Sequence, residues 1–346
     1  MRRAGVTAFL SASGQREPRD RTTRRRLRTI PTVLGLALVA YAGLPLWITL
    51  AAVWDLSRAL RRRTATGLRL LAFGAVYLAY EVLGIARLGL LMAVTRPGSE
   101  ARLAATYRIQ AWWAGRLFAA ARRIFGFRIS VDGDLGTGPV LVLMRHASLV
   151  DTLLPAALNA GPSPLRLRYV LKRELLALPC LDIAGHILPN AFVDRGGTDS
   201  QAEVARVAAL AERLGERDGV LLYPEGTRHS AARLSRALER VSQSDPARAQ
   251  RLAPLRKSLP IRSGGVLALL AGAPEADVVI AMHRGLEGLT TLREIVAGGL
   301  VGCAIDVKLT RHARSELPEQ DQWLDWLDAR WLEVDQWVTG RSTPQS

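Results

Sequence analysis

The sequence predicts an α/β domain, built as a mixed sheet flanked by helices, with an N-terminal membrane-associated helical segment. Three observations indicate this: two long apolar segments lie near the N-terminus, short β-like runs alternate with helical patterns after residue 127, and polar motifs directly follow two of these runs. We expect a basic tail at 1–30, a membrane-anchoring helical hairpin at 31–96, one large domain at 100–340 and a short tail at 341–346.

The positive charge is concentrated in two short segments. The formal net charge is +16; residues 1–30 hold nine arginines against Glu17 and Asp20, and residues 55–69 hold five against Asp55. These segments flank a membrane-length apolar run, so we expect them to bind anionic lipid headgroups. We expect no nucleic-acid partner, because the basic residues lack the interleaved aromatic side chains that stack on bases.

The first apolar segment, residues 31–54, contains no charged side chain. At about 1.5 Å per residue, a helix of this length can cross a hydrocarbon core, with Trp47 and Trp54 near one interface. A cleaved signal peptide is disfavoured, because the apolar part is too long and begins too far from Met1.

The second apolar segment, residues 67–94, is weaker, because Arg69, Glu81 and Arg87 interrupt it. It fits a second span, a re-entrant leg or an interfacial helix. Glu81 and Arg87 do not have the spacing of a helical ion pair, so the segment neutralises neither charge itself. The positive-inside rule keeps both basic segments in the cytoplasm, and a shallow hairpin in one leaflet satisfies it. We therefore expect a cell-membrane protein with its large domain on the cytoplasmic face.

A break at residues 97–99, Pro-Gly-Ser, precedes a helical pattern at 102–127 in which arginines alternate with tryptophan, leucine and phenylalanine. This amphipathic helix fits packing on a sheet and also fits lying on a bilayer. Near the C-terminus, Trp and Leu recur with helical spacing at 323–338, and we expect that helix to pack on the domain.

Seven short runs predict the strands of the sheet, and helical patterns fill the spaces between them, most clearly at 199–217. The runs are FRISVDG at 127–133, VLVLM at 140–144, LRYVLK at 167–172, AFVD at 191–194, GVLLY at 219–223, DVVIAM at 277–282 and VGCAIDVKL at 301–309.

A histidine and an aspartate follow the second of these runs. His146 lies five positions before Asp151, directly after the apolar residues 140–144. On a regular helix, residues five apart point about 140° away from each other, so these side chains meet only if His146 precedes a helix and Asp151 lies in its first turn. There, the carboxylate fixes the tautomer of the imidazole, and the other ring nitrogen can take a proton from a hydroxyl. The same spacing fits a capping or packing histidine beside an ordinary helix N-terminal acid.

A second polar loop follows the apolar residues 219–222. It reads YPEGTR at 223–228 and places a carboxylate, a flexible backbone, a hydroxyl and a guanidinium at one strand end: Glu225, Gly226, Thr227 and Arg228. An arginine is suited to holding a phosphate with two parallel hydrogen bonds. Because sites in such sheets collect at strand ends, we expect this loop and the His146 loop to share one edge.

Residues 146–151, HASLVD, and 225–228, EGTR, resemble the first and third sequence blocks of the glycerolipid acyltransferases of the lysophosphatidic acid acyltransferase (PlsC-like) family. Residues 172–196 are similar to that family's second block, in which K-x-E-L leads to F-x-x-R. The blocks occur in the family's order with similar spacing, and the resemblance covers residues 100–340. The family's two-helix membrane motif is similar to the hairpin expected at 31–96.

The resemblance implies a membrane-bound O-acyltransferase in which His146 removes a proton from the acceptor hydroxyl and Asp151 orients the imidazole. The hydroxyl would belong to a lysophospholipid, foremost 1-acylglycerol-3-phosphate, and would attack the thioester of acyl-CoA or acyl carrier protein. Neither a metal, another cofactor nor a covalent enzyme intermediate is implied.

The resemblance also implies a set of acceptor-binding residues. Lys172, Arg195 and Arg228 would line the phosphate site. Glu225 and Gly226 would shape the pocket near the acceptor, and Thr227 belongs to the same loop. Lys172 is one of only three lysines against 44 arginines, which slightly favours a need for a compact ammonium there over chance.

Two departures from the family pattern concern the acceptor. Residues 278–285, VVIAMHRG, lack the proline of the family's fourth block, and residues 229–256 form a long insert. After the insert, LRKSLPIRSGG at 255–265 resembles a segment of the longer branch, which includes lysocardiolipin-type acyltransferases. This places the chain nearer that branch and leaves another lysophospholipid acceptor open.

Two other functions fit the same residues. The chain would transfer acyl groups to a glycolipid, glycan or peptide if Arg195 and Arg228 prove unnecessary for acceptor binding. A catalytically silent membrane scaffold would use the fold for lipid binding, although intact His146 and Asp151 argue against it. Cys180 and Cys303 lie in unrelated contexts without metal-like spacing, so we expect a reducing compartment and no metal site.

Overall fold

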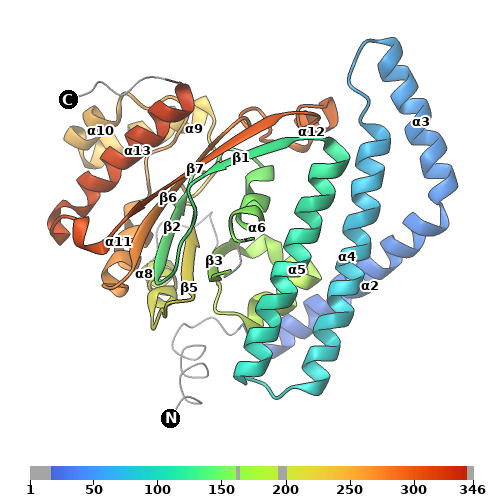
Figure 1. The fold of residues 1–346 in the computed structure, drawn as a ribbon, viewed down its shortest axis with the longest axis horizontal. Helices are drawn as coiled ribbons and strands as arrows, with labels where there is room; N and C mark the ends of the chain where they lie inside the picture. Colours follow the sequence, from blue (N-terminus) through green and yellow to red (C-terminus); the bar gives the residue numbers. More distant parts are fainter. Residues whose placement is uncertain (1–16, 161–163, 194–200, 341–346) are drawn as a thin grey trace.

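The computed structural model describes residues 17–160, 164–193 and 201–340 (Figure 1). Its centre is a seven-stranded sheet with the strand order β1-β7-β6-β2-β5-β3-β4. All neighbouring strands are parallel except β6 and β7, which pair antiparallel. The strands are β1 (Arg128–Asp132), β2 (Val140–Met144), β3 (Arg166–Lys172), β4 (Ala191–Val193), β5 (Asp218–Leu222), β6 (Asp277–Arg284) and β7 (Ala304–His312).

The predicted fold class, a mixed sheet flanked by helices, is confirmed, and each of the seven β-like runs overlaps one strand. The central strand β2 is buried at every position, because helices cover both faces of the sheet. A strand in this position needs apolar side chains on both sides, which explains why residues 140–144 are continuously apolar and do not alternate with polar residues.

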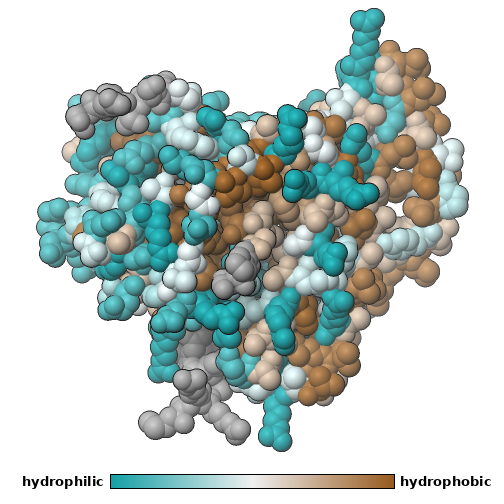
Figure 2. All heavy atoms as spheres, viewed as in Figure 1, coloured by the Kyte–Doolittle hydropathy of each residue, from teal (hydrophilic) through white to brown (hydrophobic). Residues whose placement is uncertain are grey.

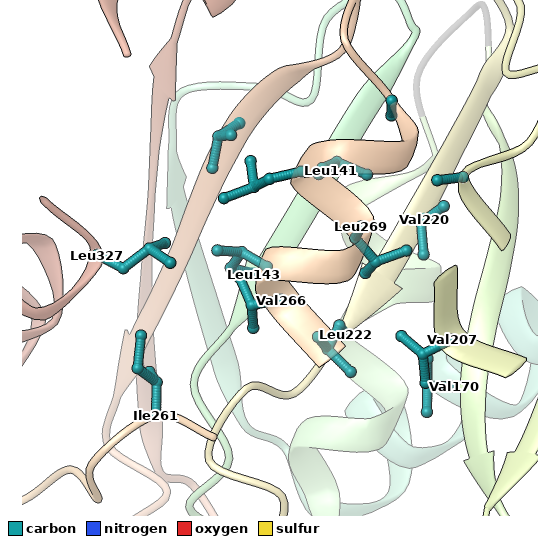
Figure 3. Packing of buried hydrophobic residues seen from close by; sticks show 14 of the residues in the cluster. Leu141, Leu143, Val170, Val207, Val220, Leu222, Ile261, Val266, Leu269 and Leu327 are labelled. Carbon is teal, nitrogen blue, oxygen red and sulfur yellow. The ribbon is translucent and has the colours of Figure 1, made fainter. Parts of the chain in front are cut away.

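Two hydrophobic cores lie on opposite faces of the sheet. On one face, α8 (Gln201–Ala208), α11 (Ser263–Gly272) and α13 (Trp323–Thr339) cover β2, β5 and β6. Figure 3 shows Val266 and Leu269 of α11 beside Leu141, Leu143 and Leu222 of the strands. On the other face, α5 (Glu100–Phe125) and the short α6 (Leu154–Leu158) cover the sheet.

The remaining elements connect these layers or precede them. The other helices are α2 (Arg19–Ala42), α3 (Leu44–Leu60), α4 (Gly67–Val94), α7 (Pro179–Ile187), α9 (Ala231–Ser244), α10 (Pro246–Leu252) and α12 (Leu292–Ala297). Short 3-10 helices are η1 (Val150–Leu153), η2 (Arg173–Ala177), η3 (Ala209–Ala211), η4 (Arg314–Glu316) and η5 (Gln320–Gln322).

The first apolar segment is not one straight helix. It is divided between α2 and α3, which meet at Gly43 with a bend of 73°. Pro45 lies at the start of α3, and a proline there can neither donate a backbone hydrogen bond nor tolerate the carbonyl of the preceding turn. The expectation of an unbroken helix at 31–54 is therefore wrong, and the bent pair fits a broken span or a re-entrant loop.

The second apolar segment, residues 67–94, forms the uninterrupted helix α4, although its three charged residues made it the weaker membrane candidate in the sequence. Within the described residues α4 is the single helix that is long and apolar enough by itself to cross a membrane. Its charged side chains find partners on other helices. Glu81 accepts a hydrogen bond of 2.8 Å from the backbone N–H of Cys180, and the guanidinium of Arg87 lies 3.6 Å from the ring centroid of Trp112.

Large hydrophobic side chains are exposed along α2 and α3, and we call this surface the leader face. Figure 2 shows it as the apolar margin at the right of the molecule. Its members are Leu34, Leu36, Leu38, Val39, Tyr41, Leu46, Ile48, Leu50, Val53, Trp54, Leu56 and Leu60. A continuous exposed apolar surface of this extent indicates an interaction with a membrane or a partner.

The leader is attached to the sheet domain at both ends. Near its start, Arg25 and Arg26 each lie 2.7 Å from the buried carboxylate of Asp182 on α7. In the last turn of α3, Arg58 donates a hydrogen bond of 2.9 Å to the carbonyl of Ala297. Two arginines of the basic tail are thus paired with a buried carboxylate of the sheet domain.

Three other helix predictions have clear outcomes. The pattern at 102–127 corresponds to α5, whose Leu117, Ala121 and Phe125 are buried against the sheet. The pattern at 323–338 corresponds to α13, which packs on the domain as expected. The pattern at 199–217 is shorter than expected in the described residues, because α8 gives way to η3 and ends at Ala211.

Candidate active site

His146 and Asp151 lie at the carboxyl end of the central strand. β2 ends at Met144, a turn follows, and η1 carries Asp151 in its first turn. Nδ1 of His146 lies 3.0 and 3.2 Å from the two carboxylate oxygens of Asp151. The two side chains therefore meet in the arrangement that their spacing predicts.

The carboxylate of Asp151 is fully buried and held from several sides. Its Oδ2 accepts hydrogen bonds of 2.7 Å from the backbone N–H groups of Ala147 and Ser148. Nε2 of the buried His283, on β6, lies 3.5 Å from the same oxygen. Burial alone would raise the pKa of Asp151, but hydrogen bonds and charge from His146 and His283 lower it well below its ordinary value. Asp151 is thus a carboxylate at neutral pH.

The far side of the His146 ring is available for chemistry. Because Asp151 accepts from Nδ1–H, the free lone pair lies on Nε2. Nε2 has no hydrogen-bond partner among the described residues and is not one of their buried unpaired polar atoms. The ring of Tyr223 packs against the imidazole with 4.6 Å between centroids, and its hydroxyl donates to the backbone oxygen of Asp151. This arrangement can accept a proton from a hydroxyl placed at Nε2.

The second polar loop lies directly beside the first. The backbone N–H of His229 donates a hydrogen bond of 3.0 Å to the carbonyl of His146. Parallel pairing of β2 and β5 brings their carboxyl ends to one edge, and this bond joins the loops that follow. The half-buried Arg228 donates to the carbonyl of Thr290, after β6, at 2.5 Å. Thr227 is half-buried in the same loop.

Gly226 has a φ of +70°, in the left-handed region where a side chain would be strained. A Cβ atom at this position would also lie 2.7 Å from Nε of Arg262. The sequence interpretation of Gly226 as a flexible backbone position therefore has a specific cause: the turn and the approach of Arg262 both exclude a side chain.

Glu225 points into the protein, away from the pocket surface where we expected it. Its side chain is 2% exposed, and its carboxylate faces Arg145, Trp331 and the backbone N–H of Leu259. Burial raises the pKa of Glu225 well above its ordinary value, and Arg145 opposes the shift only in part. Glu225 is thus in a position to support the loop from inside the protein.

The two remaining predicted binding residues are Lys172 and Arg195. Lys172 ends β3 and is paired in register with Val193 of β4, on the edge that carries His146. Arg195 lies outside the described residues. A pocket opens between these strand ends and α8, with Val170, Val193 and Leu222 among its apolar walls and Tyr223 at its boundary with the His146 ring.

Three residues at the site were missed in the sequence. Arg145 is fully buried and donates hydrogen bonds of 2.7 Å to the carbonyls of His283 and Lys257 and to the carboxylate of Glu287. His283 donates from Nε2 to the carbonyl of Arg145 at 3.1 Å. The signal for both was a polar side chain at the end of a buried apolar strand, β2 for Arg145 and β6 for His283. No sequence pattern marked Tyr223 as a site residue, apart from its position in the loop that contains Glu225.

Within the described ranges, no group of three or more His, Cys, Asp or Glu side chains is arranged to hold a metal ion. The expectation that the reaction needs no cofactor stays a prediction.

Comparison with known proteins places this geometry in context. Residues 126–264 match the family model described as Acyltransferase. No match is found among curated proteins. Among solved structures, the chain is similar to the 1-acyl-sn-glycerophosphate (LPA) acyltransferase PlsC from Thermotoga maritima, with a TM-score of 0.52 and 13% identity over 80% of this chain and 97% of that one. At that identity the likeness is one of fold.

Proposed function

We propose that the sheet domain is an acyltransferase, and that it transfers a fatty acyl group from an acyl thioester to the free hydroxyl of a lysophospholipid, foremost 1-acylglycerol-3-phosphate. The observation that carries the proposal is the His146–Asp151 pair, whose Nε2 is open on the edge that also carries Lys172 and Arg228. A paired imidazole activates a hydroxyl, and cations nearby favour an acceptor that bears phosphate.

In the proposed reaction, His146 acts first as a base and then as an acid. Nε2 takes the proton of the acceptor hydroxyl while the hydroxyl oxygen attacks the thioester carbonyl. The tetrahedral intermediate then collapses, the carbon–sulfur bond breaks, and the imidazolium returns its proton to the leaving thiolate. Asp151 stabilises the imidazolium between these steps, and the buried N–H groups of Ala147 and Ser148 keep the carboxylate in place.

Acceptor binding is proposed to use the cations of this edge. Lys172, Arg195 and Arg228 would bind the phosphate, and Gly226 and Thr227 would border the acceptor. Glu225 takes an indirect role in this scheme, since its buried side chain supports the loop from inside.

The membrane assignment is likewise a proposal. The leader face and α4 supply the apolar surface for a bilayer, and we propose that the chain acts at the cell membrane with the sheet domain on the cytoplasmic side. The segment at 255–265 supports a place near the lysocardiolipin-type branch, which keeps lysophospholipids other than 1-acylglycerol-3-phosphate among the acceptors to test.

A panel assay tests the proposal. Purified protein in detergent or vesicles is given one labelled acyl-CoA, or the matching acyl carrier protein, with a series of lysophospholipids, monoacylglycerol, a glycolipid and a peptide acceptor. Mass spectrometry of the products should show transfer to phosphate-bearing acceptors. Transfer confined to acceptors without phosphate would overturn the phosphate-site assignment, and no transfer to any acceptor would favour a non-catalytic lipid-binding scaffold.

A further inference from the structure

The pocket beside the active-site loops has apolar walls. Its lining includes Val170 of β3, Val193 of β4, Val204 and Val207 of α8, and Leu222 of β5. Figure 3 shows Val170, Val207 and Leu222 converging from three separate elements. An apolar chamber with a few polar groups at one side is suited to an amphipathic ligand.

Arg262 is the cation at the boundary between this pocket and the active-site loop. Its backbone N–H donates a hydrogen bond of 2.9 Å to the carbonyl of Pro224, which fixes it against the loop of Glu225 and Gly226. Its side chain extends over Gly226, where a Cβ atom would lie 2.7 Å from Nε and 2.8 Å from Cδ of Arg262. Because Gly226 has no side chain, the guanidinium of Arg262 can lie over it.

The guanidinium of Arg262 has no hydrogen-bond or ion-pair partner within the described part of the chain. Arg145, Arg168 and Arg248, by contrast, each donate several hydrogen bonds to carbonyls or carboxylates. A half-buried arginine that has no partner among the described residues retains its donors for a ligand.

The charges around the pocket favour an anion at this point. Lys172 lies two residues after the pocket-lining Val170 on the same strand, so the pleat places both on one face of the sheet. Glu203 is the carboxylate of the lining, and Arg206 lies 3.7 Å from it in the next helical turn. The carboxylate is thereby offset by its own neighbour, and the guanidinium of Arg262 adds a positive charge to the pocket lining.

We infer that Arg262 binds the phosphate of the lysophospholipid acceptor and determines specificity for acceptors that bear phosphate. The inference rests on the proposed function and adds a residue from outside the three sequence blocks. An arginine offers two parallel hydrogen bonds to phosphate oxygens, and its place over Gly226 joins the phosphate site to the loop beside His146.

Two substitutions and two ligands test this role. Arg262→Ala should raise the KM for 1-acylglycerol-3-phosphate about 10-fold or more and leave kcat within about threefold, since charge-assisted hydrogen bonds to the ground-state phosphate are lost. Arg262→Lys should recover part of the loss. Arg236→Ala is the matched control, because Arg236 is exposed on α9 and donates only within its own helix.

Binding of hexyl phosphate and of hexanol, measured by calorimetry, gives a readout that needs no turnover. Arg262→Ala should weaken hexyl phosphate about 10-fold and leave hexanol unchanged. Equal losses for both ligands, or an acceptor KM within twofold of wild type, would overturn the inference. If wild-type protein transfers no acyl group, the proposed function fails, and the hexyl phosphate comparison alone then decides the role of Arg262.

Gly226→Ala supplies an independent perturbation. Its new methyl group should displace the guanidinium and reproduce the loss of hexyl phosphate binding. The same change in an Arg262→Ala background should add little further loss in phosphate binding, because the displaced group is already absent. If the losses of hexyl phosphate affinity caused by Gly226→Ala and Arg262→Ala add in the double variant, the two changes do not act through the same guanidinium. Thermal melts of each variant separate these effects from unfolding.

Discussion

The carboxylate of Asp151 contacts several groups of the candidate active-site loop. Its carboxylate receives the Nδ1–H of His146 and the N–H groups of Ala147 and Ser148, and His283 lies beside it. It therefore fixes both the tautomer of the imidazole and the shape of the turn that carries it. An amide in its place retains the size but removes the charge and supplies the wrong hydrogen-bonding group.

Asp151→Asn is accordingly expected to reduce kcat about 10²- to 10⁴-fold, because the imidazole loses its fixed tautomer and the imidazolium loses its counter-charge. Steady-state kinetics with one lysophospholipid acceptor measure this, and a melting temperature within a few degrees of wild type excludes unfolding as the cause. A kcat within fivefold of wild type would remove Asp151 from the mechanism.

We expect Glu225 to make the free energy of unfolding depend on pH, because burial raises its pKa well above the ordinary 4.5. The folded protein then binds this proton more tightly than the unfolded chain does. Its contribution to the free energy of unfolding is complete below pH 4.5 and falls as the pH rises toward the folded pKa, by up to about 1.4 kcal/mol per pH unit. Glu225→Gln cannot ionise and should lose this dependence.

Melting temperatures of wild type and Glu225→Gln between pH 5 and 8 test the point. The variant should gain relative to wild type as the pH rises. Glu239→Gln, exposed on α9, is the control and should follow wild type. A constant difference between Glu225→Gln and wild type across this range would show that Glu225 does not titrate in the way its burial implies.

Sequence patterns predicted the His146–Asp151 pair, but they did not predict the surroundings of Glu225 or the position of His283. The spacing of His146 and Asp151 is a local property, so helix geometry alone showed where they could meet. The burial of Glu225 and the approach of His283 depend on α13 and β6, which are distant in the sequence. No local pattern contains that information. For the same reason, the sequence marked the segment at 255–265 by its resemblance but did not predict that Arg262 lies over Gly226.

At the scale of elements, α13 holds the insert at 229–256 through buried acids. Asp328 accepts two hydrogen bonds, of 2.7 and 2.9 Å, from the buried guanidinium of Arg248 on α10. Asp335 accepts from the backbone N–H groups of residues 256–258. The acidic residues of the Trp-rich helix therefore serve to attach the segment that leads to Arg262.

Asp328→Ala should lower the free energy of unfolding by about 3 kcal/mol or more, because it leaves the charge of Arg248 buried without a partner. Asp325→Ala on the same helix is the matched control. It breaks an ion pair of 2.6 Å with Arg251 that is largely exposed, and the expected cost is below about 1 kcal/mol. Chemical denaturation measures both, and equal costs would mean that Arg248 finds another partner.

Elements with a strong local signal agreed with the sequence prediction, and elements set by a single residue did not. The seven strands follow directly from short apolar runs between turn residues. The helix at 31–54 looked continuous because its hydropathy is continuous, whereas Gly43 and Pro45 divide it. Hydropathy reports which solvent a segment prefers and does not report where its backbone bends.

At the scale of the whole molecule, the leader face and the sheet domain form one body, tied by Arg25 and Arg26 to Asp182 and by Arg58 to the carbonyl of Ala297. A bilayer that receives the leader face would therefore hold the active-site edge in a fixed orientation.

Leu38→Glu combined with Val53→Glu should weaken binding to vesicles at least about 10-fold, because both side chains are exposed on the leader face and each loses its transfer into hydrocarbon. Co-sedimentation with vesicles that contain phosphatidylglycerol measures the bound fraction. Val131→Glu, at an exposed apolar position on β1, is the control and should bind as wild type does. Equal binding by all three proteins would mean that another surface meets the bilayer.

The central claim is that Nε2 of His146 takes the proton of the acceptor hydroxyl. The most direct measurement is single-turnover acyl transfer from labelled acyl-CoA to 1-acylglycerol-3-phosphate by wild type and by His146→Ala. With the acceptor and donor both saturating, the variant should be at least about 10³-fold slower while its melting temperature and its affinity for hexyl phosphate stay close to wild type. Transfer by a folded His146→Ala protein at a rate within tenfold of wild type would contradict the account.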